Sequence, residues 1–204
     1  MSSITYYNKN AQIYSKRTVN GCRLEFRERF LAQLKPGVRI LDVGCGVGRE
    51  ARFFEELGYD VTAVDGSEEM IKLASQILKK PPLFMRFQDM NFSEEFDGIW
   101  AAASLIHVPS HELKDIISRI WKALKPEGIF FANFKHGEGE YTQEERTFYY
   151  ITETSLRPYL ADQFKIIDIW TAENRSSHFA HSPDKLWLNV LGRKISRKSL
   201  QEHF

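Results

Sequence analysis

Cysteine is scarce in this chain of 204 residues, which contains only Cys22 and Cys45. Two thiols do not build the disulfide framework that holds small secreted domains together. The first ten residues also lack the basic and then apolar order of a secretory signal peptide. We therefore expect a cytoplasmic protein.

A long apolar run and an excess of charge of one sign are also missing. No apolar run approaches the about 20 residues that span a bilayer, and the formal net charge is +1. Neither nucleic acid nor a membrane is therefore expected as a partner. Because there is no internal repeat and no linker rich enough to divide the chain, residues 1–204 are expected to form one domain, as a monomer or homodimer.

What the chain does contain is an alternation of short apolar runs with amphipathic helical patterns. The apolar runs predict strands at residues 38–43, 60–65, 83–87, 96–103 and 129–134. The helical patterns predict helices at residues 5–18, 26–34, 49–57, 67–78, 110–124 and 154–160, with Ser67 and Ser110 as caps. This order is typical of an α/β fold, a parallel sheet with helices on both faces.

Two parts of this pattern give more detail. Residues 96–103 have almost no polar residue after Asp97, which indicates a central strand buried on both faces. Residues 165–170 and 185–191 predict two last strands with no helix between them. Consecutive strands joined by a loop can pair as an antiparallel hairpin, so a reversed strand is expected at the edge of the sheet.

A glycine turn follows the first predicted strand of the sheet. It reads Asp42-x-Gly44-x-Gly46-x-Gly48 and leads into the helix that starts near Arg49. Glycines at this spacing let the backbone approach a ligand closely, and the helix points free N–H groups at the turn. A dinucleotide fingerprint would place its third glycine one residue later. The acid before the first glycine suits a cofactor with positive charge, such as a sulfonium or an ammonium.

Two further acids follow the next two predicted strands. Asp65 ends the second strand, where its carboxylate can accept hydrogen bonds from both hydroxyls of a ribose. Asp89, with Met90 after it, follows the third strand, in reach of an adenine amino group. The three features together predict a site for an adenosine cofactor.

These segments resemble the motifs of class I S-adenosylmethionine-dependent methyltransferases. ILDVGCGVGRE resembles their first motif, VTAVDGSEEM the acidic motif of strand two, and FQDM the segment that contacts adenine. FDGIWAAASLIHVP and LKPEGIFFANF resemble the motifs of strands four and five. The resemblance covers about residues 34–134. It implies a Rossmann-like sheet of seven strands, mostly parallel with an antiparallel C-terminal strand, and S-adenosylmethionine as cofactor, with S-adenosylhomocysteine as product.

The resemblance also divides the chain and assigns its site. Residues 1–35 would be N-terminal cap helices, residues 36–134 the cofactor-binding core, and residues 135–204 an acceptor-side loop and a C-terminal hairpin. The implied cofactor-binding residues are Asp42, Gly44, Cys45, Gly46, Gly48, Asp65, Gly66, Ser67, Asp89, Met90, Ala103 and Tyr14. The segment from Tyr6 to Arg17 resembles the cap helix of small-molecule members; the alternative is a helix that only covers the edge of the sheet.

The acceptor is expected to be a small molecule. The Asn/Asp-Pro-Pro-Tyr/Phe element of the DNA and protein amide methyltransferases is replaced at residues 102–107 by AASLIH, and no basic domain for RNA is appended. Residues 135–150 are expected to form a mobile lid, the alternative being an ordinary exposed loop. Tyr7, Arg146, Tyr149 and Tyr150 are the candidate acceptor contacts.

Other polar residues have plainer interpretations. The basic tail of Arg193, Lys194, Arg197 and Lys198 predicts a solvated terminus. No metal is expected, because His178 and His181 have no third ligand nearby.

His107 is the candidate catalytic base. It follows the fourth strand, and an imidazole titrates near neutral pH. The alternative is a histidine that packs in its loop, since an acceptor that is already an anion needs no base.

The sequence therefore predicts a methyltransferase that acts on a small molecule, and three alternatives stay open. A nicotinamide-dependent oxidoreductase shares the Rossmann-like start, but the glycine spacing opposes it. A non-catalytic S-adenosylmethionine-binding regulatory module would keep the same cofactor motifs. A methyltransferase acting on tellurite or a thiol is a more specific acceptor class that no residue selects.

Overall fold

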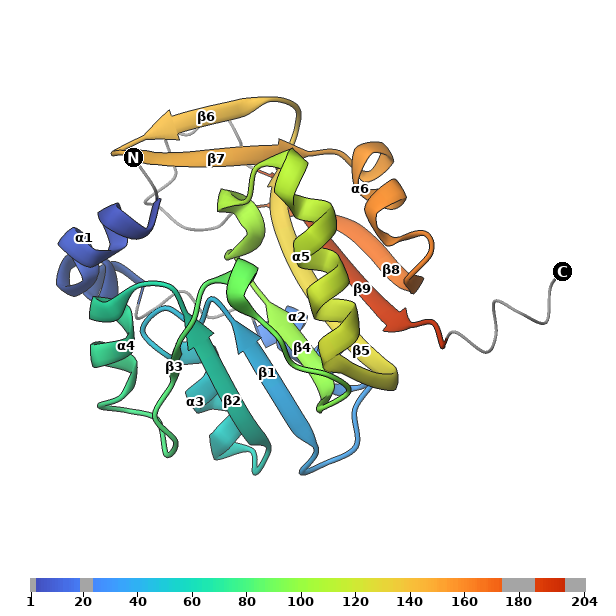
Figure 1. Cartoon of the computed structure of the whole chain (residues 1–204), viewed down its shortest axis with the longest axis horizontal. Coiled ribbons are helices and arrows are strands. Elements are labelled where there is room, and N and C mark those ends of the chain that lie inside the picture. The colour runs from blue at the N-terminus through green and yellow to red at the C-terminus, as the bar shows by residue number, and fades with distance from the viewer. Residues whose placement is uncertain (1–2, 19–23, 174–185, 197–204) are drawn as a thin grey trace, which may run out of the picture.

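The central feature of the protein is a twisted, mostly parallel sheet. A computed structural model describes residues 3–18, 24–173 and 186–196. Five parallel strands lie in the order β3-β2-β1-β4-β5 (Figure 1). They are β1 (Arg39–Val43), β2 (Asp60–Asp65), β3 (Leu83–Phe84), β4 (Phe96–Ala101) and β5 (Leu124–His136). The predicted third and fourth strands end earlier than expected, because residues 87–89 turn into a short 3-10 helix and the chain leaves the sheet after Ala101.

The sheet continues past β5 with two C-terminal strands. β9 (Leu186–Lys194) runs antiparallel to β5, with Phe131 opposite Leu191, and β8 (Phe164–Glu173) runs antiparallel to β9. The seven strands β3-β2-β1-β4-β5-β9-β8 confirm the predicted mostly parallel sheet with an antiparallel C-terminal strand.

A hairpin stands where a mobile loop was expected. Residues 140–151 form β6 (Glu140–Gln143) and β7 (Arg146–Ile151), and the end of β7 pairs with the end of β5. The hairpin brings the sheet to nine strands. The two residues between β6 and β7, Glu144 and Glu145, have φ angles of 50° and 64°, as the tight turn of a two-residue hairpin requires. The prediction of a loop at residues 135–150 was wrong because this turn carries no Asn-Gly or Asp-Gly signal.

Helices cover both faces of the sheet. In the view of Figure 1, α5 (Ser110–Ala123) lies in front, and α2 (Leu24–Leu31) and α3 (Arg49–Glu56) lie behind. α1 (Ser3–Thr18), α4 (Glu68–Ala74) and α6 (Glu153–Leu160) lie nearer the sides, and two 3-10 helices, η1 (Phe87–Asp89) and η2 (Leu105–His107), follow β3 and β4. Ser67 caps α4 as expected, whereas Pro109 is the cap residue of α5 and Ser110 is its first residue.

The core consists of two apolar layers separated by the sheet. Ile99 of β4 packs in the front layer with Ile116 and Ile120 of α5. Its neighbour Trp100 packs in the rear layer and stacks on Phe131 of β5 with ring centroids 4.2 Å apart. The side chains of successive strand residues point to opposite faces, so β4 is buried on both sides, as its composition predicted.

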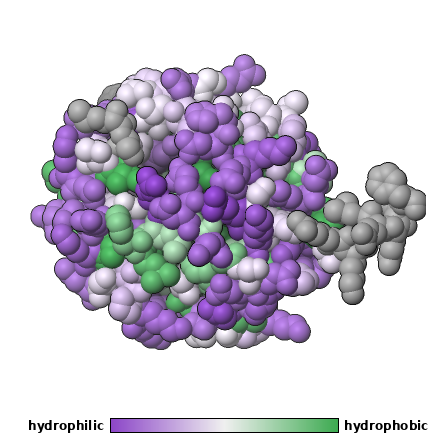
Figure 2. All heavy atoms as spheres, viewed as in Figure 1, coloured by the Kyte–Doolittle hydropathy of each residue, from purple (hydrophilic) through white to green (hydrophobic). Residues whose placement is uncertain are grey.

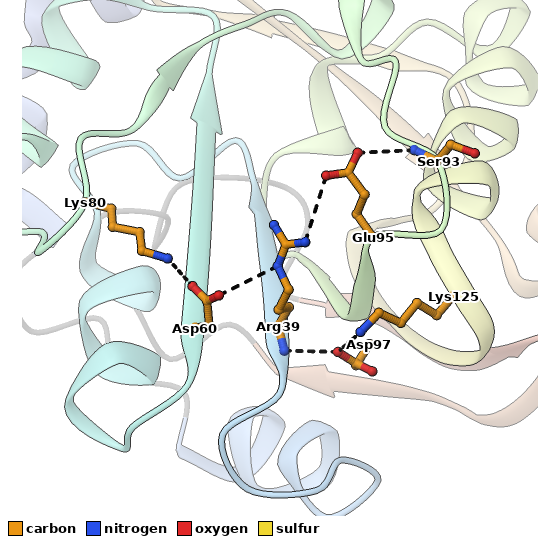
Figure 3. Close-up of polar contacts among 7 residues, drawn as sticks. All are labelled: Arg39, Asp60, Lys80, Ser93, Glu95, Asp97 and Lys125. Atoms are coloured by element: carbon orange, nitrogen blue, oxygen red, sulfur yellow. Dashed lines mark hydrogen bonds and ion pairs between the residues drawn. The ribbon is translucent and has the colours of Figure 1, made fainter.

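The amino ends of the strands are joined by a surface network of charges (Figure 3). Asp97 of β4 accepts hydrogen bonds from the Arg39 backbone N–H at 3.0 Å and from Lys125 Nζ at 2.8 Å. Asp60 of β2 pairs with Arg39 and Lys80. Because these side chains are partly exposed, each pair contributes at most about 1 kcal/mol. This edge is filled by structural pairs, so the ligand site has to be sought at the carboxyl edge.

The surface corrects one prediction about charge. Lys194 is 3% exposed, and its Nζ donates to the Leu124 carbonyl at 2.6 Å and pairs with Glu94 at 3.3 Å. The predicted solvated tail was therefore wrong for Lys194, because β9 extends through it; Arg197, Lys198, His178 and His181 lie outside the described residues. The face in Figure 2 is mostly hydrophilic, with a few small apolar areas. In the described ranges no helix is long and apolar enough to cross a membrane.

Candidate functional site

The glycine turn after β1 needs glycine at each of its three positions. Gly44, Gly46 and Gly48 have φ angles of 76°, 54° and 82°, in the left-handed region that side chains disfavour. A Cβ on Gly44 would also lie 2.4 Å from Cβ of Ser104. The turn is held to β2 because the N–H groups of Gly44 and Cys45 both donate to the Val64 carbonyl.

Asp65 joins the glycine turn to the start of α4. Its Oδ2 accepts from the Gly46 N–H and its Oδ1 from the Ser67 N–H, both at 2.8 Å. Burial raises the pKa of this carboxyl, and the backbone donors act in the opposite direction. A carboxylate has about four acceptor positions, so Asp65 keeps capacity for the hydroxyls of a ligand.

Asp42 lies beneath the same turn and is 2% exposed. Its Oδ2 has no hydrogen-bond partner in the part of the chain that the structure describes. Burial raises the pKa of this carboxyl well above its usual range, and the nearby charges of Glu50 and Asp65 add to the effect. A cation bound at the turn would therefore gain from Asp42. Burial also raises the pKa of the Cys45 thiol, which keeps this free cysteine in its unreactive form.

The turn opens into a pocket of about 320 Å³ at the carboxyl edge of the sheet. Of the predicted site residues, the pocket wall contains Gly44, Gly46, Asp65, Gly66, Ala103, Tyr7, Tyr14, His107 and Tyr149. It also contains residues that were not individually predicted as site residues, namely Ser3, Ile4, Met70, Arg86, Phe87, Gln88, Ser104, Val108, Pro109, Glu112 and Thr147. Asp42, Cys45, Gly48 and Ser67 are not part of this wall.

In the segment after β3, the residues that line the pocket lie one or two positions before those that were expected to. Asp89 is exposed and its Oδ2 accepts from Arg86 Nε at 3.0 Å, a hydrogen bond that lowers the pKa of the Asp89 carboxyl. Met90 is buried and its carbonyl accepts from Arg119. Phe87 and Gln88 line the pocket instead, because η1 rotates residues 87–89 relative to an extended chain. The resemblance of FQDM to the adenine-contacting segment includes both residues, but the expected contacts were Asp89 and Met90, because the apolar pattern does not reveal the 3-10 turn.

Side chains alternate between the two sides of β7, and this alternation separates the predicted acceptor contacts into residues that line the pocket and residues that do not. Thr147 and Tyr149 line the pocket, whereas Arg146 and Tyr150 do not. Arg146 is 7% exposed; its guanidinium lies 4.3 Å from the centre of the Tyr6 ring and donates to Glu144 at 2.9 Å. A strand points successive side chains to opposite sides, which a loop need not do, so this division could not be predicted without the hairpin.

Tyr7 and His107 form a neutral pair in the pocket wall. His107 Nδ1 lies 2.8 Å from the Thr147 carbonyl, and a carbonyl only accepts, so Nδ1 carries the hydrogen. Nε2 is then an acceptor, and the Tyr7 hydroxyl donates to it at 2.8 Å. Burial lowers the pKa of His107 to about 4, with Arg146 and Lys135 adding to the effect, and burial raises the pKa of Tyr7.

α1 is fixed over the pocket by polar contacts from consecutive residues. The Tyr6 hydroxyl donates to Glu144 in the hairpin turn at 2.8 Å, and Lys9 pairs with Glu145 at 3.2 Å. Asn8 Oδ1 accepts from the Ser67 hydroxyl at 2.7 Å. α1 therefore joins the cofactor side of the sheet to the hairpin side, as a cap would.

The fold and the site together define a class. A parallel α/β sheet with a glycine turn after β1, an acid at the end of β2 and a pocket at the carboxyl edge is the arrangement of a Rossmann-like nucleotide-cofactor protein.

Comparison with known proteins finds similarity to methyltransferases over part of the chain. Residues 41–132 match the family model described as a methyltransferase domain. Squalene methyltransferase 1 of Botryococcus braunii is 36% identical over 115 residues, which are 52% of this chain and 30% of that protein. The chain thus spans about a third of the length of the curated relatives it matches.

Solved structures agree on the fold. A 1,6-didemethyltoxoflavin-N1-methyltransferase of Burkholderia thailandensis, solved with its substrate and S-adenosylhomocysteine, has a TM-score of 0.74 at 22% identity, over 95% of this chain and 85% of that one. The [4+2]-cyclase SpnF has a TM-score of 0.75 at 18% identity, over 93% and 94% of the two chains. Residues 41–132 thus resemble a methyltransferase domain, and the fold of the chain is that of solved S-adenosylmethionine-dependent methyltransferases.

Proposed function

We propose that this protein binds S-adenosylmethionine and transfers its methyl group to a small-molecule acceptor, with S-adenosylhomocysteine as the product. The observation that carries the proposal is the link between Asp65 and the glycine turn at the wall of one pocket. Asp65 would hold the ribose, the glycine turn would let the methionine part approach the backbone closely, and Asp42 would offset its positive charge. Phe87 and Gln88, which line the pocket, would contact the adenine.

The shape of the pocket supports a small acceptor. α1 and the β6–β7 hairpin lie over the carboxyl edge, beside the pocket of about 320 Å³ that the acceptor would share with the cofactor. On the side of η2 and β7 its wall includes Tyr7, His107, Thr147 and Tyr149, which carry no formal charge when His107 is neutral, and the charged residues Arg86 and Glu112 also line the pocket. Squalene and 1,6-didemethyltoxoflavin, which appear in the names of two similar proteins, are both small molecules.

The reaction needs alignment more than activation. A lone pair of the acceptor attacks the methyl carbon, the bond from that carbon to sulfur breaks, and its electron pair stays on sulfur. The protein contributes by aligning the two reactants and by excluding water. We propose that His107 contributes by holding the Tyr7 hydroxyl toward the acceptor, because its Nε2 already accepts from Tyr7 and its pKa of about 4 makes it a weak base. Direct proton removal by His107 is the alternative.

Titration calorimetry with S-adenosylhomocysteine and with NAD tests the cofactor. We expect binding of S-adenosylhomocysteine, and Asp65→Ala should cost about 1.5–3 kcal/mol of its affinity. Tighter binding of NAD would overturn the assignment, and a change below about threefold in Asp65→Ala would remove the ribose role.

Formation of S-adenosylhomocysteine across a broad panel of small acceptors, with thiols and tellurite included, tests turnover. Cofactor binding without any turnover would favour the regulatory module instead. The scarcity of cysteine supports a reducing location such as the cytoplasm for this activity.

A further inference from the structure

The backbone between β4 and η2 is held in a strained form by a buried side chain of β5. Ala103 has a φ angle of 54°, a conformation that non-glycine residues rarely adopt. Its N–H donates to Oδ1 of Asn133 at 2.6 Å, and Asn133 is completely buried. Since the N–H needs an acceptor, the bond also fixes which side of the Asn133 amide is oxygen. Strain of this kind persists only where the surroundings enforce it, and it is concentrated at functional sites.

The residue that this arrangement sets in place is Ser104. Ser104 lines the pocket, is 7% exposed, and its hydroxyl has no hydrogen-bond partner within the described ranges. It faces the glycine turn closely, since a Cβ on Gly44 would lie 3.2 Å from Ser104 Oγ. Buried hydroxyls are nearly always paired, so a hydroxyl kept unpaired beside a ligand pocket points to a ligand atom as its partner.

We propose that the Ser104 hydroxyl binds the amino-acid end of S-adenosylmethionine, and that Asn133 is the positioning residue that sets Ser104 through Ala103. This inference rests on the proposed function, which places the methionine part of the cofactor at the glycine turn. The Ser104 hydroxyl donates to the carboxylate of that part, and a hydrogen bond to a charged group is among the stronger ones in proteins.

Two probes that differ only at the amino-acid end test the proposal. S-adenosylhomocysteine carries the amino-acid end, whereas 5′-methylthioadenosine has the same nucleoside and sulfur without it. By titration calorimetry, Ser104→Ala should weaken S-adenosylhomocysteine by about tenfold or more and 5′-methylthioadenosine by less than about twofold. Asn133→Leu should also weaken S-adenosylhomocysteine much more than 5′-methylthioadenosine. The double variant should lose no more affinity for S-adenosylhomocysteine than the weaker-binding single variant.

Asn189→Leu is the matched control. Asn189 is also fully buried, lies opposite Asn133 in the register of β5 and β9, and donates to the carbonyls of Trp170 and Trp187 rather than accepting from Ala103. It should show no preference between the two probes.

The outcomes separate this inference from the proposed function. Equal losses for both probes, or no loss in Ser104→Ala, would overturn the role of Ser104. A split in Ser104→Ala without one in a folded Asn133→Leu would overturn the role of Asn133. If Asn133→Leu fails to fold, Asn133→Asp takes its place. This variant keeps an acceptor for the Ala103 N–H, so it should bind both probes as the parent protein does. Failure of the parent protein to bind S-adenosylhomocysteine at all would count against the proposed function instead.

Discussion

The carboxyl group of Asp42 couples ligand binding at the site to the release of a proton. Its folded-state pKa is raised above its ordinary value of about 3.9, so in the pH range between the two values the folded protein holds a proton that the unfolded chain has released. The contribution of Asp42 to the free energy of unfolding therefore falls as pH rises through this range. A cationic ligand favours the carboxylate, so binding in this range should release a proton.

Asp42→Asn should reduce that proton release. Calorimetry of S-adenosylmethionine binding in buffers of different ionisation enthalpy, at mildly acidic pH, measures the number of protons. We expect the variant to release fewer protons, to lose about 1.5–3 kcal/mol of affinity, and to be more stable than the parent without ligand near neutral pH, because a buried charge is removed. Asp65 supplies the remaining release, as its pKa is also raised. An unchanged proton number in Asp42→Asn would contradict this account.

Tyr7 and His107 are expected to act as one unit. If His107 works by holding Tyr7, then Tyr7→Phe and His107→Ala should lower turnover by similar factors, and the double variant should lose little more. Turnover of the parent should also show no titration near pH 6.5, because His107 is already neutral there. Initial rates from pH 5 to 9 measure this. A loss of about 10²–10⁴ in His107→Ala with a much smaller loss in Tyr7→Phe would favour direct proton removal by His107.

Sequence and structure agree best on residues that the backbone itself demands. The glycines of the turn and Asp65 could be predicted because their spacing reflects tight geometry within one βαβ unit. The resemblance of FQDM covered Phe87 and Gln88, but their place in the pocket wall and that of Ser104 could not be predicted, because η1 and the left-handed Ala103 orient them. Neither feature leaves a periodic trace in the sequence.

The same contrast holds for whole elements. The five parallel strands and α5 were predicted because each is an apolar run or stripe ended by glycine, proline or charge. The β6–β7 hairpin was missed because its tight turn is Glu144-Glu145, where both residues adopt positive φ without a glycine. Such a turn is costly by itself, and contacts elsewhere have to justify it.

Glu144 makes more of the contacts that hold the hairpin turn than Glu145 does. Glu144 accepts from Tyr6 and from Arg146, whose side chain is 9% exposed, whereas Glu145 makes a partly exposed ion pair with Lys9. Glu144→Gly should therefore lower the free energy of unfolding by about 1–3 kcal/mol. Glu145→Gly is the matched control, because it relieves the same backbone strain and loses a pair worth at most about 1 kcal/mol.

Urea titration of both variants measures this difference. We expect Glu145→Gly to be as stable as the parent or more stable. The hairpin turn would have no anchoring role for α1 if the two variants changed the free energy of unfolding by the same amount.

At the scale of the whole molecule, the sheet has a filled edge and an open edge. Ion pairs join the strands at their amino ends (Figure 3), and the glycine turn, η2 and the hairpin surround the pocket at the carboxyl ends. α1 crosses from α4 to the hairpin over this pocket, so three separate parts of the chain meet on one helix.

This placement of α1 has a consequence in time rather than in affinity. An exit of the spent cofactor by the side where α1 lies would require the contacts of Tyr6, Tyr7 and Asn8 to break together. The slow step of a catalytic cycle would then be the movement of α1 away from the pocket. The rate of that step does not depend on how nucleophilic the acceptor is. Acceptors of very different reactivity would then have nearly the same turnover number.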